Sequence, residues 1–149
     1  MFRRILLAVD GSKHAMRAAV AAIDLAQQYG SALDVITVVK KPSTEISEQL
    51  RHYMAVENIP ATLEEMVDRR SQEILAQVED HARKKGLSEV RKVAKLGQPA
   101  RTIVDHAAQI GADLIVMGSR GLGDIEGLLL GSVSHKVSTL AKCSCLTVR

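Results

Sequence analysis

The feature that most constrains the fold is an alternation, along the whole chain, of short apolar runs with segments of helical periodicity. The first run, Ile5–Val9, is apolar without a break, which is typical of a parallel strand buried on both faces. The apolar residues that follow lie three and four apart, on one face of a helix: Ala15, Ala18, Ala19, Ala22, Ile23 and Ala26. We therefore expect a strand and then a helix, which Ser12 caps and Gly30 ends.

The same alternation continues to the C-terminus. Further strands are predicted over Ala32–Val39, Glu89–Lys95, Asp113–Met117 and Cys143–Val148. Further helices are predicted from about Ala61 to Lys85, from Pro99 to Gly111 and from Ser132 to about Ala141, with a short one around Glu45–Ala55. This order predicts an α/β fold with a parallel sheet, in a single domain that covers residues 1–149.

The apolar content of the strands also predicts their order. The third strand carries Arg91, Lys92 and Lys95, and the fifth is short, so both are expected at the edges. With right-handed crossovers, the order 3-2-1-4-5 in an open five-stranded sheet, with helices on both faces, satisfies this. The direction of winding then reverses between strands one and four, where open α/β sheets bind ligands.

Composition and charge exclude several classes of protein. Among 149 residues, 46% are hydrophobic and 25% charged, which excludes a disordered chain, and apolar runs of at most six residues exclude a membrane span. The chain opens without a signal-peptide pattern, so the cytoplasm is the expected location. The net charge is +3, but Phe2, Tyr29 and Tyr53 are the only aromatic residues, too few to stack bases. Basic runs at Arg83–Lys85 and Arg91-Lys92 are interpreted as solvated surface, so nucleic acid is not expected as a partner.

Glycines cluster after the fourth strand. Five of the 14 residues from Gly118 to Gly131 are glycine, and Gly131-Ser132 opens the next helix. Glycine lets backbone N–H groups approach an anion, and a helix N-terminus supplies further N–H groups with positive dipole character. The segment predicts a phosphate cradle, against the alternative of a loop that is rich in glycine only for turning. Neither the P-loop pattern nor the dinucleotide G-x-G-x-x-G fingerprint occurs there.

The pattern Gly118-x2-Gly121-x9-Gly131-Ser132 resembles the universal stress protein family, whose nucleotide-binding members carry G-x2-G-x9-G-[ST]. The resemblance extends to Ile5–Ser12, Gly97–Ala100 and Asp113–Ser119, and it is weakest over Lys40–Pro60. It implies a Rossmann-like fold, a role in the stress response, and ATP or another adenine nucleotide at the switch point. Mg²⁺ would be held largely through the phosphates.

The resemblance also implies roles for individual residues. Asp10 would bind the ribose, although its alternative role is to cap the following turn. Ala8 and Val38 would line the adenine pocket, with Val9 and Met117 beside them. The residues that would wrap the ribose and phosphates are Gly118, Ser119, Arg120, Gly121 and Gly131, and those that would donate hydrogen bonds to phosphate are Ser132, Val133 and Ser134. Lys40 departs from the family pattern, since many relatives have an acid there.

No strong catalytic or metal-binding constellation is visible, so ATP turnover or self-phosphorylation would be weak at most. One alternative is a slow ATP-hydrolysing enzyme that uses Asp124 or Glu126, which are otherwise solvated loop carboxylates. Another is a nucleotide-free basic module that binds nucleic acid or a protein. Cys143 and Cys145, which would face the same side of the last strand, are interpreted as structural.

The final expectation concerns assembly. The last strand, Ser144 to Val148, lies at a sheet edge, and an apolar edge invites pairing with another chain. The resemblance implies a homodimer through this strand, together with a protein partner that the sequence does not identify.

Overall fold

The computed structural model describes residues 1–40, 52–53, 55–57, 63–123 and 130–149, and for residues 63–67 it describes the backbone alone. Most of the short helix predicted around Glu45–Ala55 lies outside the described residues. So do the loop carboxylates Asp124 and Glu126.

The described strands form one parallel sheet in the predicted order β3-β2-β1-β4-β5. They are β1 (Arg4–Ala8), β2 (Ala32–Val39), β3 (Val90–Leu96), β4 (Leu114–Gly118) and β5 (Ser144–Val148). The central strand β1 places Leu6 opposite Asp34 of β2 and Ile115 of β4. The continuous apolar run in β1 is explained by this position, because it is covered on both faces.

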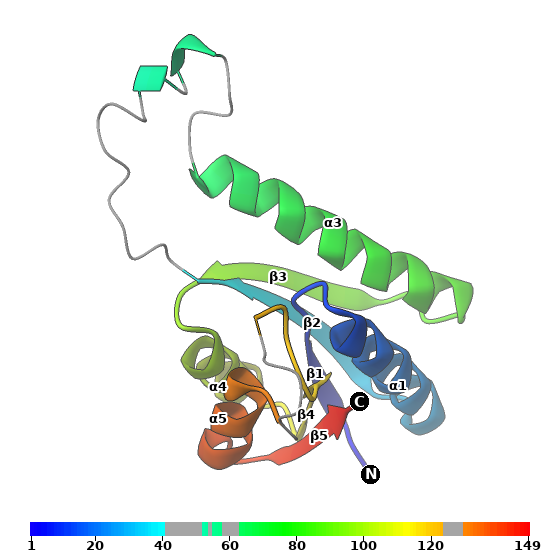
Figure 1. Ribbon diagram of the computed structural model, residues 1–149. Helices are drawn as coiled ribbons and strands as arrows, with labels where there is room; N and C mark the ends of the chain where they lie inside the picture. The colour runs from blue at the N-terminus through cyan, green and yellow to red at the C-terminus, as the bar shows by residue number, and fades with distance from the viewer. Residues whose placement is uncertain (41–51, 54, 58–62, 124–129) are drawn as a thin grey trace.

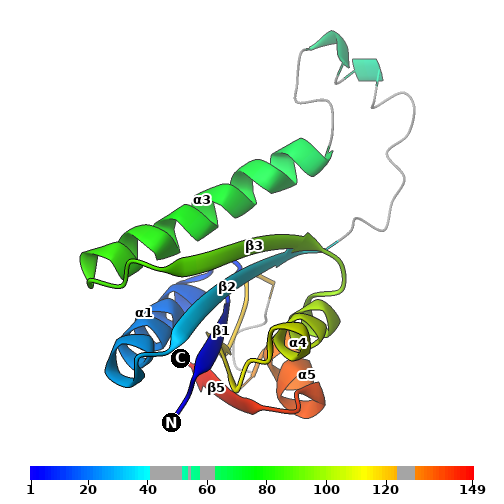
Figure 2. The same ribbon diagram turned by 180° about the vertical axis from the view of Figure 1, so that it is seen from behind.

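Helices cover both faces of the sheet, as predicted (Figure 1). On one face lie α1 (Lys13–Tyr29) and α3 (Leu63–Lys84), and on the other lie α4 (Pro99–Ile110) and α5 (Ser132–Leu140); Figure 2 shows the same layers from behind. The predicted alanine face of α1 is buried in the first core layer with Ile74, Val78 and Ala82 of α3. Small side chains allow α1 to approach the sheet closely.

The helix ends follow the local sequence. Ser12 is the N-cap of α1, and its Oγ accepts a hydrogen bond from the Ala15 backbone N–H at 3.1 Å. Gly30 and Gly111 end α1 and α4 in the left-handed conformation, with φ of 63° and 67°, which costs glycine no steric strain. The predictions of Ser12 as a cap and of Gly30 as a stop are confirmed.

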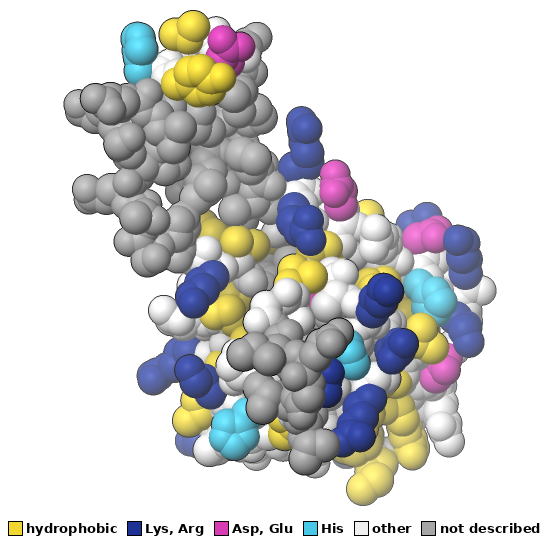
Figure 3. Space-filling view, in the orientation of Figure 1, with side chains coloured by type: hydrophobic (Ala, Val, Ile, Leu, Met, Phe, Trp, Pro, Cys, Tyr) yellow, Lys and Arg dark blue, Asp and Glu magenta, His cyan; other side chains and the backbone are white. Residues whose placement is uncertain are grey.

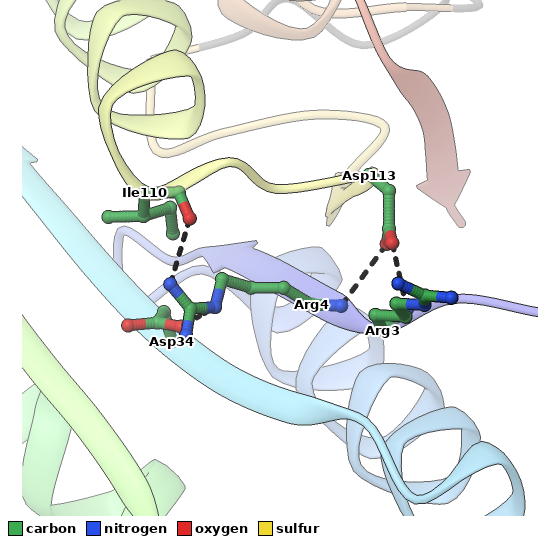
Figure 4. A network of polar contacts seen from close by, with 5 residues as sticks. All are labelled: Arg3, Arg4, Asp34, Ile110 and Asp113. Carbon is green, nitrogen blue, oxygen red and sulfur yellow. Dashed lines mark hydrogen bonds and ion pairs between the residues drawn. The ribbon is translucent and has the colours of Figure 1, made fainter.

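The starts of β1, β3, β4 and β5 depart from the prediction by one residue, and a polar network explains those of β1 and β4. Asp113, predicted as the first residue of a strand, precedes β4 and accepts backbone N–H bonds from Arg3 at 2.8 Å and Arg4 at 3.3 Å. The Arg4 guanidinium donates to the Ile110 carbonyl at 2.8 Å and pairs with Asp34 at 3.7 Å (Figure 4). The pairing offsets the burial of Asp34, which is 5% exposed. This network joins the amino-terminal ends of β1, β2 and β4.

Three lysines of the basic runs pair with acids of α1 and α3. Lys84 lies 2.7 Å from Asp80, and Lys85 lies 3.2 Å from Asp24. On β3, Lys92 lies 2.5 Å from Glu79, and this hydrogen bond holds the pKa of Glu79 below its usual value. These pairs agree with the interpretation of the runs as surface.

None of the helices in the described parts of the chain combines the length and apolar character needed to cross a bilayer.

Candidate functional site

An apolar slot of about 130 Å³ lies where β1, β2 and β4 end. Its floor consists of Ala8, Ile36, Val38 and Met117, and Ile103 of α4 closes one side. These strand residues share one face of the sheet because side chains alternate along a strand. A slot with such walls can take a flat apolar ring.

Most of the residues that were predicted from the sequence to bind the nucleotide line the slot. They are Ala8, Val9, Asp10, Val38, Met117, Gly118, Arg120, Gly121, Val133 and Ser134. Ala15, Ile36, Pro99 and Ile103 also line it and were missed. The usable signal was the switch-point rule itself, since the first turns of the helices that follow the strands must border the same opening.

A second, wider groove of about 610 Å³ continues from the slot, and we call it the outer groove. Asp10, Pro99, Gly121 and Val133 line both cavities and so form their junction. Among the described residues of the outer groove, Lys40, Arg101 and Lys136 are basic and Asp10 is acidic. Figure 3 shows Lys and Arg side chains over α4 and α5 on this side of the molecule. The outer groove therefore favours an anion.

Asp10 joins the first turn to the glycine-rich segment. Its Oδ1 accepts the Ser12 backbone N–H at 2.9 Å, and its Oδ2 accepts the Leu122 backbone N–H at 3.1 Å. The turn-stabilising role considered from the sequence is therefore observed. The carboxylate also borders both cavities, where its remaining acceptor sites can meet the hydroxyl groups of a ligand.

Gly118 permits a close approach between β4 and α1. A Cβ at this position would lie 2.8 Å from the backbone nitrogen of Ala15 and 2.9 Å from the Cβ of His14. Gly118 thus serves packing as well as lining the slot.

Ser119 fastens four elements together. It is 2% exposed, and its N–H donates to the Val148 carbonyl at 2.7 Å. Its carbonyl accepts the Gly131 N–H at 2.6 Å and the Ser134 hydroxyl at 2.9 Å, while its own Oγ lies 3.4 Å from His14 Nδ1. Ser119 and Gly131 line neither cavity, whereas Ser132 lines the outer groove. The N–H of Gly131 is engaged within the protein, so any phosphate at α5 would meet the N–H groups that follow it.

Cys143 and Cys145 lie on the same side and pack against the core layer beneath α4 and α5. Burial raises the pKa of both thiols, which favours neutral side chains over thiolate ligands. In the part of the chain that the structure describes, no cluster of three or more His, Cys, Asp or Glu side chains could hold a metal ion.

Comparison with known proteins agrees with this architecture. The model of the universal stress protein family matches residues 1–149. The universal stress protein YxiE of Bacillus subtilis is 34% identical over 149 residues, which cover all of both chains. Universal stress protein UspA from Lactobacillus plantarum has a TM-score of 0.81 at 25% identity, with 99% of this chain and 97% of that chain covered. A universal stress protein in complex with cAMP has a TM-score of 0.71 at 25% identity over 99% of this chain and 97% of that chain.

Proposed function

Because the chain belongs to the universal stress protein family, we propose that it is a cytoplasmic regulator of the stress response that binds ATP at the carboxyl edge of its sheet. The observation that carries the proposal is the apolar slot that opens, at Asp10 and Gly121, onto a basic outer groove. An adenine nucleotide has two matching parts, a flat aromatic base whose faces pack against apolar side chains and an anionic phosphate chain. The structural relative in complex with cAMP supports an adenine nucleotide as the ligand class.

In the proposed mode of binding, the adenine occupies the slot between Val38 and Ile103. Asp10 accepts hydrogen bonds from the ribose. The phosphates meet Gly121 and the first turn of α5, where Ser132, Val133 and Ser134 stand at the helix N-terminus. The Ser134 hydroxyl donates within the protein, to the Ser119 carbonyl, so this residue would contribute its backbone N–H instead.

Mg²⁺ fits this site only through the phosphates. The described lining of the outer groove offers a single carboxylate, Asp10, whereas Mg²⁺ bound with nucleotides is held mainly by phosphate oxygens and water. When bound, the ion would neutralise part of the phosphate charge. The protein's own residues would position the nucleotide, and we expect weak turnover at most.

Binding would act on the protein by stabilising the folded state and the glycine-rich segment. We propose that the readout is a homodimer formed through β5, together with a protein partner that recognises the nucleotide-bound surface. Leu146, in the middle of this edge strand, is 37% exposed and apolar. Leu146→Asp is expected to shift the protein towards the monomer in sedimentation velocity; an unchanged distribution would contradict a dimer through β5.

The nucleotide proposal is tested by isothermal titration of ATP with Mg²⁺, and by mass analysis of nucleotide released from the freshly purified, denatured protein. Val38→Trp fills the slot with a bulky side chain and should abolish binding. Val20→Trp adds the same side chain to the exposed face of α1 and should leave binding intact, provided that circular dichroism shows both variants folded. If no adenine nucleotide co-purifies with the wild type or binds to it at several temperatures, the proposal is wrong.

A further inference from the structure

We infer that the outer groove selects nucleotides by the length of their phosphate chain, and that Lys40, Arg101 and Lys136 bind the outer phosphates. The protein then takes ATP in preference to AMP and to cyclic monophosphates. This inference rests on the proposed binding of ATP and adds the discrimination against shorter phosphate chains and the residues responsible for it.

The first step is the placement of the three cations. Lys40 directly follows β2, Arg101 lies in the first turn of α4, and Lys136 lies in the middle of α5. All three line the outer groove, and none of them lines the slot. Segments that are far apart in the sequence therefore direct positive charge into one cavity.

The second step is the order of the two cavities. They meet at Asp10 and Gly121, so a nucleotide with its ring in the slot passes this junction before its chain enters the outer groove. A monophosphate ends near the junction. A second and third phosphate extend into the wider cavity, towards the lysines and the arginine.

The third step is the balance of charge. Elsewhere on the surface, Lys84, Lys85 and Lys92 pair with carboxylates. Lys40 and Lys136 have no acidic partner among the described residues. Arg101 lies 3.5 Å from Asp105, but both side chains are mostly exposed, so the pair screens little of the charge. Asp10 is the single carboxylate in the described lining, against these three cations, so that lining keeps a surplus of positive charge.

These three steps predict a steep dependence of affinity on phosphate number. Each added phosphate brings negative charge to a cavity whose described lining carries surplus positive charge, so ATP should bind at least ~10-fold more tightly than AMP at low ionic strength. The preference should shrink as salt is added, because exposed charges are screened.

The experiment measures the dissociation constants of ATP, ADP, AMP and cAMP by isothermal titration at fixed Mg²⁺. It compares the wild type with the double variant Lys40→Gln/Lys136→Gln. The matched control, Lys84→Gln/Lys92→Gln, removes the same charge from paired lysines outside the cavities. In Lys40→Gln/Lys136→Gln we expect the AMP dissociation constant to exceed the ATP dissociation constant by about threefold or less. In the control we expect the ratio of the two constants to stay at its wild-type value.

The outcomes separate the inference from the proposed function. If the wild type binds ATP, AMP and cAMP equally well, nucleotide binding stands and selection by chain length is wrong. The same conclusion follows if the wild-type ratio is unchanged in Lys40→Gln/Lys136→Gln. If no adenine nucleotide binds, the proposed function fails and this inference fails with it.

Discussion

Replacement of Gly118 by alanine tests the close approach between the end of β4 and the first turn of α1. The new Cβ would lie 2.8 Å from the Ala15 nitrogen, 2.8 Å from the His14 carbonyl carbon and 2.9 Å from the His14 Cβ. Two of these atoms belong to the backbone of a helix, so they cannot rotate away as a side chain would. The variant can fold only if the end of β4 and the first turn of α1 move apart.

The size of the effect follows from these distances. Non-bonded carbon atoms are in ordinary contact at about 3.5–4.0 Å, so the two elements must separate by roughly 0.7 Å or more. Overpacking of this kind costs about 1–3 kcal/mol, and rigid backbone neighbours place Gly118→Ala at about 2–3 kcal/mol. For a domain of this length, each kcal/mol lowers Tm by about 2–4 °C, so the expected fall is roughly 4–12 °C.

The assay is urea denaturation followed by circular dichroism, without nucleotide, with the midpoint lowered and the m value unchanged. Gly123→Ala is the matched control, because a Cβ there meets nothing within 4 Å, and its stability should stay within about 0.5 kcal/mol of the wild type. If Gly118→Ala is as stable as Gly123→Ala, β4 and α1 do not approach each other as closely as the structure has them, and the reasoning fails.

Two further predictions concern a helix cap and a histidine. Ser12→Ala removes the acceptor of the Ala15 N–H at the start of α1 and should lower the free energy of unfolding by about 1 kcal/mol; Ser12→Asp, measured in the same urea titration, should restore most of it. Burial, reinforced by the positive charge of Lys95, lowers the pKa of His106 from its usual 6.5, so the folded protein favours the neutral imidazole. The unfolded chain therefore binds the proton more readily, and the contribution of His106 to stability is fully present above pH 6.5 and is lost as the pH falls towards the lower folded-state pKa. Urea titrations at pH 7, 6 and 5 should show a shallower loss for His106→Gln than for the wild type, and parallel curves would contradict the assignment.

The sequence predicted the layers of this fold well because burial leaves a periodic trace. The alanines of α1 recur at helical spacing since they face the sheet, and β1 is apolar throughout because it is covered on both sides. The ends of the strands were harder to predict from the sequence, because they are set by backbone hydrogen bonds between strands and not by side-chain type. Gly118 belongs to β4 with no side chain to mark it, whereas Asp113 was placed in the strand although its carboxylate binds the backbone of Arg3 and Arg4.

The candidate site was predictable where chemistry follows position in the chain, and less so where it depends on distant pairs. The floor of the slot lies at the ends of strands, and the apolar runs in the sequence show where those strands end. Arg101 and Lys136 lie on helices and belong to the outer groove only because α4 and α5 pack side by side. The hydroxyl of Ser119 faces His14, 105 residues earlier in the chain, and no local pattern encodes that contact.

The contacts of Ser119 also suggest how a bound nucleotide could influence the edge strand. Asp10 accepts the Leu122 N–H, and the segment that begins three residues before Leu122 is tied through Ser119 to the Val148 carbonyl at the end of β5. A ribose that adds hydrogen bonds to Asp10 would therefore act on a carboxylate tied to a segment that is anchored to the proposed dimer edge. Linkage makes such coupling reciprocal: if ATP tightens the dimer by some factor, the dimer must bind ATP more tightly than the monomer by the corresponding factor. Sedimentation with and without ATP measures one side of this relation, and titrations of wild type and Leu146→Asp measure the other. A dimer whose dissociation constant is the same with and without ATP would show that the two sites are independent.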